Sequence, residues 1–298
     1  MKHYLLLCAI LSAAATYANN TALLRIDADL PAGNIIVDSI ENDTVKLQQD
    51  LRDSKQWFYW AFRVRGANGR TLHFDFINKK GNGPVGVRGP VVSTDGGKTF
   101  TYPLDGKSKS DGFTYTFGVN DNDVLFYECH PYVRADWDRF VKRHEKHLGK
   151  HFAVETLCRS RKGADVPAAR IGCINKEPKF RYFVSARHHA SESMGSFVLE
   201  GAAEIFFRDD TRGEWLRENV ELMIVPFADY DGVQAGDQGK GRKPHDHNTS
   251  SFADSRLRKV SSQTITFFPY ALTNFVQCIT WSMKRSNLSS VEQREQGM

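Results

Sequence analysis

The feature of this chain that most constrains its fold is a pair of apolar segments separated by an amphipathic one. The pattern predicts strands at 180–186 and 222–228, with a helix at 193–208 between them. The apolar stripe of that helix is formed by Phe197, Val198, Gly201 and Ile205. A strand, a helix and a second strand in this order are typical of a crossover unit, whose two strands lie parallel in one sheet. We therefore predict an α/β fold with a mixed, mostly parallel sheet and flanking helices.

A histidine and a glutamate three residues apart follow the first of these strands. His189 and Glu192 are the ends of an H-x-x-E step, and ligands of open α/β sheets bind at the carboxyl ends of the strands. Imidazole and carboxylate are both zinc ligands, and a catalytic zinc site needs a third protein ligand and an open position for water or substrate. The step predicts a metal site at His189 and Glu192, with a polar loop that caps the helix as the alternative.

The residues around this step resemble the zinc carboxypeptidases, in the branch close to the cytosolic carboxypeptidases. That branch reads A-R-x-H-P-G-E-[ST], and this chain reads Ala186-Arg187-His188-His189-Ala190-Ser191-Glu192-Ser193. A second block, at 229–233, reads D-Y-D-G-V and is close to the family's N-P-D-G-V. A third block, at 239–248, resembles the segment that ends in D-x-N-R. The resemblance covers about residues 45–248 and implies a fold like that of carboxypeptidase A.

The resemblance also implies a cofactor, a substrate and four site residues. It assigns zinc to His189 and Glu192. In the family, an Asn-Arg pair and an earlier arginine bind the free carboxylate of the substrate, and Asn248 and Arg242 match these positions, although Thr249 stands where the second arginine is expected. Both follow the second strand, so we expect them at the same rim of the sheet as the metal ligands. The implied function is zinc-dependent removal of C-terminal residues from peptides or proteins.

The sequence beyond Asn248 departs from the family's pattern. The family has a second histidine ligand and a glutamate general base there, whereas no histidine occurs after His247, and no catalytic glutamate is identified. We expect 249–298 to be an atypical tail, as after a shifted reading frame. Two zinc ligands without the third should bind zinc weakly, so we expect the activity of this chain to be impaired. A sheet that ends near 248 would also leave an apolar edge strand unpaired.

Residues 19–128 are predicted to form an all-β domain. The run at 71–76 alternates between apolar and polar residues, and glycine-rich turns separate it from other short strands. This pattern is typical of a sandwich or jelly roll, and related carboxypeptidases carry such a domain ahead of the catalytic one. Trp57, Trp60 and Phe62 follow the period of a strand, which favours packing in a core over sugar binding.

A helix is predicted between this domain and the next. Residues 129–151 contain an apolar side and three histidines at spacings of three and four: Trp137, Phe140, Val141, His144, His147 and His151. The histidines do not form an H-E-x-x-H motif, because Leu148 stands four residues after the first of them. We therefore expect a solvated connecting helix, followed at 152–248 by the N-terminal part of the carboxypeptidase-like domain.

The first eighteen residues are predicted to be an export signal. A short charged start precedes an apolar run at 4–15 that is too short to span a bilayer, and 16–18 ends in a small-x-small cleavage site. We therefore expect a secreted or periplasmic protein with no membrane span after removal of the signal. In an oxidising compartment Cys158 and Cys173 can pair, with free thiols as the alternative. The net charge of +5 is too small to favour nucleic acid, and the oligomeric state is not predicted.

Two other functions are compatible with the sequence. A non-catalytic exported binding protein would recognise glycan or peptide with its β-sandwich and keep the degenerate peptidase domain as a scaffold. A different metal hydrolase would use His188, His189 and Glu192 together with His245 and His247. Zinc at one equivalent per chain would favour the carboxypeptidase over the binding protein.

Overall fold

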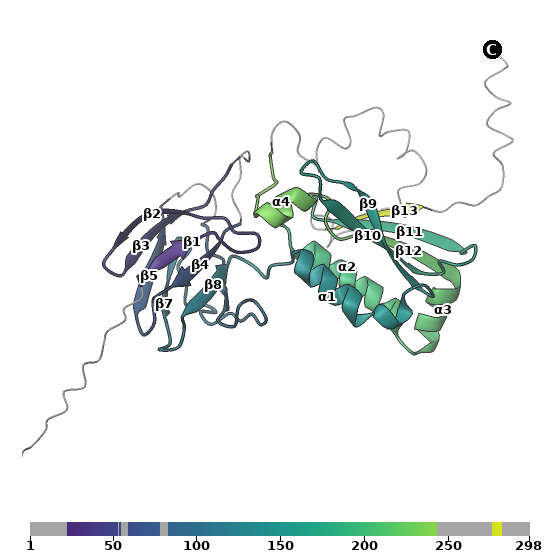
Figure 1. The fold of residues 1–298 in the computed structure, drawn as a ribbon, viewed down its shortest axis with the longest axis horizontal. Coiled ribbons are helices and arrows are strands. Elements are labelled where there is room, and N and C mark those ends of the chain that lie inside the picture. Colours follow the sequence, from purple (N-terminus) through teal and green to yellow (C-terminus); the bar gives the residue numbers. More distant parts are fainter. Residues whose placement is uncertain (1–22, 53, 55–58, 78–82, 243–275, 282–298) are drawn as a thin grey trace, which may run out of the picture.

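The computed structural model describes residues 23–52, 54, 59–77, 83–242 and 276–281. These residues form two regions, one built from strands β1 to β8 and the other from a sheet with helices against it (Figure 1). The first region contains two four-stranded sheets and the second a five-stranded sheet. The short helix α4 (Tyr230–Ala235) lies between the two regions.

The strands of the first region are mostly antiparallel. One sheet has the order β1-β4-β8-β6, with β1 (Arg25–Asp27), β4 (Ala61–Arg65), β8 (Asp123–Tyr127) and β6 (Val91–Ser93). The other has the order β2-β3-β5-β7, with β2 (Ile36–Glu41), β3 (Thr44–Gln48), β5 (Thr71–Phe76) and β7 (Gly112–Thr116). Among the described strands of these two sheets, β3 and β5 form the one parallel pair.

An aromatic core lies between these two sheets. Every second residue of β5 is buried, as expected for a strand with one face on a core. Trp60 is fully buried, and its ring centroid lies 5.7 Å from that of Phe62 and 5.0 Å from that of Phe76. Its Nε1 donates to the carbonyl of Pro84 at 2.6 Å. The prediction of core packing is confirmed for Trp60 and Phe62, whereas Trp57 lies outside the described residues.

Helix α1 (Arg134–Arg143) follows the first region and packs against the second. Its Trp137 and Phe140 are buried in the same core as the five-stranded sheet. His144, at the end of the helix, is 6% exposed, and its Nε2 lies 3.0 Å from Glu204 Oε1. The prediction of solvated histidines is therefore wrong at this position, because the end of the next helix covers the imidazole.

The five-stranded sheet has the order β13-β11-β12-β10-β9. Its strands are β9 (Phe152–Arg159), β10 (Asp165–Gly172), β11 (Phe180–Ala186), β12 (Val220–Val225) and β13 (Val276–Trp281). The pair β11–β12 is parallel, as predicted, but the other three described pairs are antiparallel. The mixed sheet is confirmed, and the prediction that it is mostly parallel is wrong for these strands. A five-residue connection between β9 and β10 is too short for a crossover, so these strands form a hairpin.

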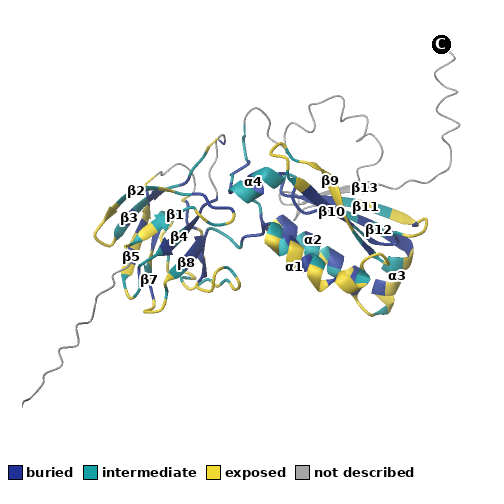
Figure 2. Cartoon of the chain, in the orientation of Figure 1, coloured by how far each residue is buried: buried dark blue, intermediate teal, exposed yellow. Residues whose placement is uncertain are grey.

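The crossover between β11 and β12 is made by helices that lie along one face of the sheet (Figure 1). They are α2 (Met194–Glu204), the 3₁₀ turn η2 (Ile205–Phe207) and α3 (Thr211–Asn219). The buried residues of α2 are Gly195, Ser196, Leu199 and Ala203, and the helix has buried and exposed residues along its length (Figure 2). The predicted apolar stripe is wrong at Gly201 and Ile205, which are exposed, whereas Phe197 is partly buried and packs against the core. The reason is a polar residue on the buried face: Ser196 is fully buried, and its Oγ donates to the carbonyl of Pro226 at 2.8 Å.

Strand β13 comes from the stretch that was predicted to be an atypical tail. It pairs with β11 in antiparallel register, from Arg181 opposite Trp281 to Ala186 opposite Val276. The predicted unpaired edge is therefore wrong for β11, because this pairing satisfies the backbone groups on its outer side.

Three cysteines lie among the residues with described side chains, and all are free thiols. Cys158 is exposed on β9, Cys173 is buried, and Cys129 is intermediate. The predicted alternative of free thiols is thus the one found for the pair at 158 and 173. Within the described ranges, no helix has the length and apolar character needed to cross a bilayer.

Candidate active site

The H-x-x-E step forms a tight turn at the carboxyl end of β11. The Nδ1 atom of His189 lies 2.9 Å from Glu192 Oε1, and the Glu192 N–H donates to the His189 carbonyl at 3.2 Å. The imidazole side chain is 4% exposed and the carboxylate side chain 15% exposed. The structure thus places the two predicted metal ligands side by side in a nearly buried setting.

The buried side chain of Arg187 supports this turn through hydrogen bonds. It is 3% exposed, and its φ of 62° lies in the left-handed region, which costs a non-glycine residue on the order of 1 kcal/mol. Its Nε donates to the Ala190 carbonyl at 2.9 Å, and a terminal nitrogen donates to the Tyr132 carbonyl at 2.8 Å. Burial lowers the pKa of the guanidinium to about 10, so it stays protonated at neutral pH. Sequence reasoning assigned it no role, since Tyr132 lies 55 residues away.

The second block of the resemblance, at 229–233, forms the start of α4, next to this turn. The Asp229 N–H donates to the Arg187 carbonyl at 2.9 Å. Asp229 caps α4, because its Oδ1 accepts from the Gly232 N–H at 3.2 Å. The helix ends at Gly236, whose φ of 76° is in the left-handed region. The chain then continues into residues 236–242, which we call the arginine loop.

Arg242, the predicted carboxylate-binding residue, ends this loop between two acidic side chains. One terminal nitrogen donates to Asp229 Oδ2 at 2.7 Å and the other to Asp237 Oδ2 at 2.8 Å. The Arg242 side chain is 14% exposed and that of Asp229 is 5% exposed. The guanidinium is therefore oriented by the protein before any substrate binds. Neither ion pair could be predicted from the sequence, because nothing in the spacing distinguishes a loop aspartate that pairs with arginine from a solvated one.

The arginine loop runs directly along the H-x-x-E turn. The Ser191 N–H donates to the Gln238 carbonyl at 3.3 Å, and a Cβ added at Gly239 would lie 2.4 Å from the Ala190 nitrogen. Lys240 Nζ lies 4.0 Å from Glu192 Oε1. We predicted that residues after the two strands lie at the same rim of the sheet. The His189–Glu192 turn and the loop that carries Arg242 do lie side by side there.

The remaining predicted residues contribute less to the described site. Asn248, His245 and His247 lie outside the described residues. The Nε2 atom of His188 lies 2.8 Å from Ser185 Oγ. No group of three or more histidine, cysteine, aspartate and glutamate side chains is arranged to hold a metal ion in the part of the chain that the structure describes.

The donors of the turn nevertheless suit zinc in kind. An imidazole nitrogen and a carboxylate oxygen that already face each other are two of the three protein ligands that catalytic zinc sites use. The described residues therefore fit part of a zinc site. The third ligand is not among them.

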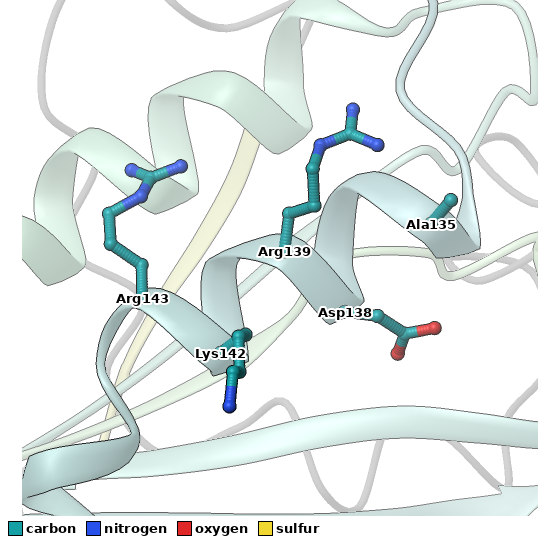
Figure 3. A pocket seen from close by; sticks show the side chains of 5 residues that line it. All are labelled: Ala135, Asp138, Arg139, Lys142 and Arg143. Atoms are coloured by element: carbon teal, nitrogen blue, oxygen red, sulfur yellow. The ribbon is translucent and has the colours of Figure 1, made fainter. Parts of the chain in front are cut away.

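An open hollow of about 660 Å³ lies along α1 (Figure 3). It is lined by Ala135, Asp138, Arg139, Lys142 and Arg143. None of these side chains belongs to the H-x-x-E turn or to the arginine loop, so the hollow is not part of the candidate active site.

Curated relatives of this chain are cytosolic carboxypeptidases. Cytosolic carboxypeptidase 2 of Xenopus tropicalis is 28% identical over 220 residues, which cover 64% of this chain and 22% of the relative. Cytosolic carboxypeptidase 6 of Caenorhabditis elegans is 23% identical over 246 residues, which cover 76% of this chain and 53% of the relative. The chain thus spans about a fifth to a half of the length of these relatives.

Solved structures of carboxypeptidases share the fold. A metallo-carboxypeptidase from Pseudomonas aeruginosa, in complex with (2-guanidinoethylmercapto)succinic acid, matches with a TM-score of 0.64 and 25% identity, over 80% of this chain and 66% of that one. A metallo-carboxypeptidase from Burkholderia cenocepacia matches with a TM-score of 0.65 and 21% identity, over 78% and 63%. These likenesses confirm a carboxypeptidase-like α/β fold.

The prediction of a secreted or periplasmic protein is wrong. The curated relatives are cytosolic carboxypeptidases, and this finding contradicts the expectation of export. A short apolar run alone is weak evidence for export, because it carries no information about the rest of the chain. The same finding argues against export of the non-catalytic binding protein that was considered as an alternative. Residues 1–22 lie outside the described residues.

The family model of the zinc carboxypeptidases matches residues 138–289, just over half of the chain. The match includes both strand ends of the candidate site, and it extends past 248, where the resemblance was expected to stop, to include β13. With the fold and the sequence match in agreement, this chain belongs to the zinc carboxypeptidase family.

Proposed function

We propose that this chain contributes metal-binding and substrate-binding residues to a zinc-dependent carboxypeptidase that removes C-terminal residues from peptides or proteins. The observation that carries the proposal is the 2.9 Å contact between His189 and Glu192, on a turn that lies against the loop of Arg242. A metal-ligand pair and a cationic group at one rim are what cleavage next to a free carboxylate requires.

His189 and Glu192 would hold the zinc ion. When bound, zinc lowers the pKa of its water ligand and polarises the scissile carbonyl. Arg187 keeps the two ligands in place by binding the Ala190 carbonyl between them, in the way that outer residues orient metal ligands elsewhere. Lys240, 4.0 Å from Glu192, adds positive charge beside the pair.

Arg242, together with Asn248, would bind the terminal carboxylate of the substrate. Asp229 and Asp237 already fix the plane of the Arg242 guanidinium, so less side-chain entropy is lost when a substrate binds. A substrate carboxylate would share the guanidinium with these aspartates, and its affinity then depends on the net charge around Arg242.

We also propose a division of the chain into domains. Residues 19–128 would form a β-sandwich domain, supported by the single aromatic core between its two sheets. Residues 152–248 would form the N-terminal part of the peptidase domain. Residues 249–298, expected from the sequence to be an atypical tail, would continue this domain as far as 289, where the family match ends, and β13 is the part that joins the sheet. Residues 129–151, which contain α1, would connect the two domains, and the burial of Trp137 supports packing of this helix with the peptidase domain.

For the polypeptide of residues 1–298 we further propose weak zinc binding and little peptidase activity. The reason is the ligand count of the described site, which offers two of the three ligands. Release of C-terminal residues at a rate comparable to that of an intact carboxypeptidase, dependent on added zinc, would contradict this part of the proposal.

Zinc titration of the purified chain tests the metal site. We expect His189→Ala and Glu192→Gln each to lower the zinc affinity at least tenfold, about 1.4 kcal/mol, because each removes one ligand. The matched controls are His73→Ala, an exposed histidine beside Thr114 on the first region, and Glu177→Gln, an exposed glutamate paired with Arg181. Equal affinities in all four variants would refute the site.

A further inference from the structure

The arginine loop is held by the first region of the molecule as well as by the second. Gln238 is fully buried, and it forms two hydrogen bonds with the backbone of Tyr59. The Tyr59 N–H donates to Gln238 Oε1 at 2.8 Å, and Gln238 Nε2 donates to the Tyr59 carbonyl at 2.6 Å. Asn34 Nδ2 donates to the Gly236 carbonyl at 2.8 Å. The loop therefore has backbone partners in two segments that precede it by about 180 to 200 residues.

A chain of ion pairs runs from the first region to Arg242. Arg52 donates to Asp237 Oδ1, and the same terminal nitrogen donates to the Ala235 carbonyl at 2.7 Å. The other oxygen of Asp237 accepts from Arg242 at 2.8 Å. One carboxylate thus bridges two guanidinium groups, one from each region of the molecule.

The charges of this group nearly cancel. Arg52 and Arg242 carry two positive charges, and Asp50, Asp229 and Asp237 carry three negative ones, since Asp50 Oδ2 lies 3.1 Å from Arg52 Nε. Without Arg52 the net charge of the group would change from −1 to −2 next to the guanidinium that receives the substrate. All five side chains are between 5% and 35% exposed, so their charges are screened less than those of a fully solvated pair.

We propose that Arg52 is a positioning residue for the carboxylate-binding site. It offsets part of the negative charge of Asp50 and Asp237, and it thereby leaves Arg242 able to accept a further carboxylate, that of the substrate. The proposal rests on the function proposed above for Arg242. It makes the first region a structural part of the substrate site, since the residue that sets the charge beside Arg242 comes from the segment between β3 and β4.

The test compares the binding of two peptides that differ in one group, an acetylated tripeptide with a free C-terminal carboxylate and the same tripeptide with a C-terminal amide. Binding to the full chain is measured with zinc present. We expect Arg52→Met to lower the preference for the acid about fivefold or more, with little change for the amide. Arg52→Lys keeps the charge and should retain most of the preference. Arg70→Met is the matched control, because Arg70 pairs with Asp43 in the first region.

Two further measurements keep the proposal open to refutation. Asp237→Asn removes a negative charge, so we expect it to raise the preference for the acid, which a merely destabilising change would not do. Hydrogen exchange of residues 236–242 should become faster in Arg52→Met and stay unchanged in Arg70→Met.

The outcomes separate this proposal from the one it rests on. Wild-type exchange and wild-type acid preference in Arg52→Met would overturn the role of Arg52. Absence of any acid preference in the wild type would overturn the role of Arg242, whereas faster exchange in Arg52→Met would still support the hold of Arg52 on the loop.

Discussion

The two regions of the molecule differ in the kind of polar group that they bury. Among the described residues of β1 to β8 and their connections, the buried polar side chains are uncharged, namely Asn34, Gln49, Ser54 and Ser93. In the second region the buried set includes His144, Arg187, His189 and Asp229. Burying ionisable groups is costly unless each has a partner. Three of these four lie at the carboxyl ends of β11 and β12. The energetic cost of burying ionisable groups therefore falls mainly on the part of the second region that forms the candidate site.

The largest expected effect compares the cores of the two regions. Trp60 and Trp137 are both fully buried, one in each core. We expect Trp60→Ala and Trp137→Ala each to lower the free energy of unfolding by about 3–5 kcal/mol. Hydrogen exchange in urea, read separately for peptides from each region, would show whether each change acts on its own region.

The control for this pair is Trp215→Ala, because Trp215 is 49% exposed. We expect Trp215→Ala to lower the free energy of unfolding much less than either buried change. An equal loss of protection in both regions from either buried change would break the comparison, since the two cores would then unfold as one unit.

The second prediction concerns Glu128, at the junction of the regions after β8. Burial raises its pKa to about 7. As pH rises from about 4.5 to 7, the unfolded state loses this proton and the folded state keeps it, so stability falls over that interval and is constant above it. We expect the free energy of unfolding of the wild type to fall by about 3 kcal/mol between pH 4.5 and 8 because of this group, and we expect Glu128→Gln to abolish that fall.

Urea unfolding of the metal-free chain at several pH values measures this difference. Glu177→Gln, an exposed change, is the control. The same pH dependence in wild type and Glu128→Gln would show that the junction does not hold a neutral carboxyl group.

The third prediction concerns Arg187, under the metal-ligand turn. Arg187→Met would leave the carbonyls of Ala190 and Tyr132 without their guanidinium donors. We expect a loss of about 2 kcal/mol in stability and weaker zinc binding, because the turn loses its support. Zinc titration and urea unfolding measure both effects. Arg181→Met, on the strand β11 that precedes Arg187 and with a side chain that is 32% exposed, should leave zinc affinity unchanged. A similar drop there would argue against a specific role for Arg187.

The smallest expected effect concerns the face of α2 that packs on the sheet. Ser196→Ala removes the hydroxyl that donates to the Pro226 carbonyl. We expect a loss of about 1 kcal/mol in the free energy of unfolding. Ser39→Ala, whose hydroxyl lies on the surface of β2, should have almost no effect. A gain in stability for Ser196→Ala would mean that an apolar residue suits this face better.

Much of the fold was predictable because it depends on local periodicity. The alternation along 71–76 gave the strand with its residue limits, and the strand–helix–strand order gave the parallel pair β11–β12. The strands β1, β2 and β3 were not individually predicted, since only half of their residues are apolar or fewer. The buried face of α2 was missed because Ser196 does not look like a core residue.

The sequence by itself determined the family and the adjacency of His189 and Glu192, because both depend on residues close together along the chain. The tertiary structure decided which groups surround them. Arg52 and Arg242 meet at Asp237, and Gln238 binds the backbone of Tyr59, although 185 and 179 residues separate Arg52 from Asp237 and Tyr59 from Gln238. These side-chain hydrogen bonds and ion pairs have no periodicity and no fixed spacing. Such contacts exist only once both regions have packed, and they set the charge of the candidate site.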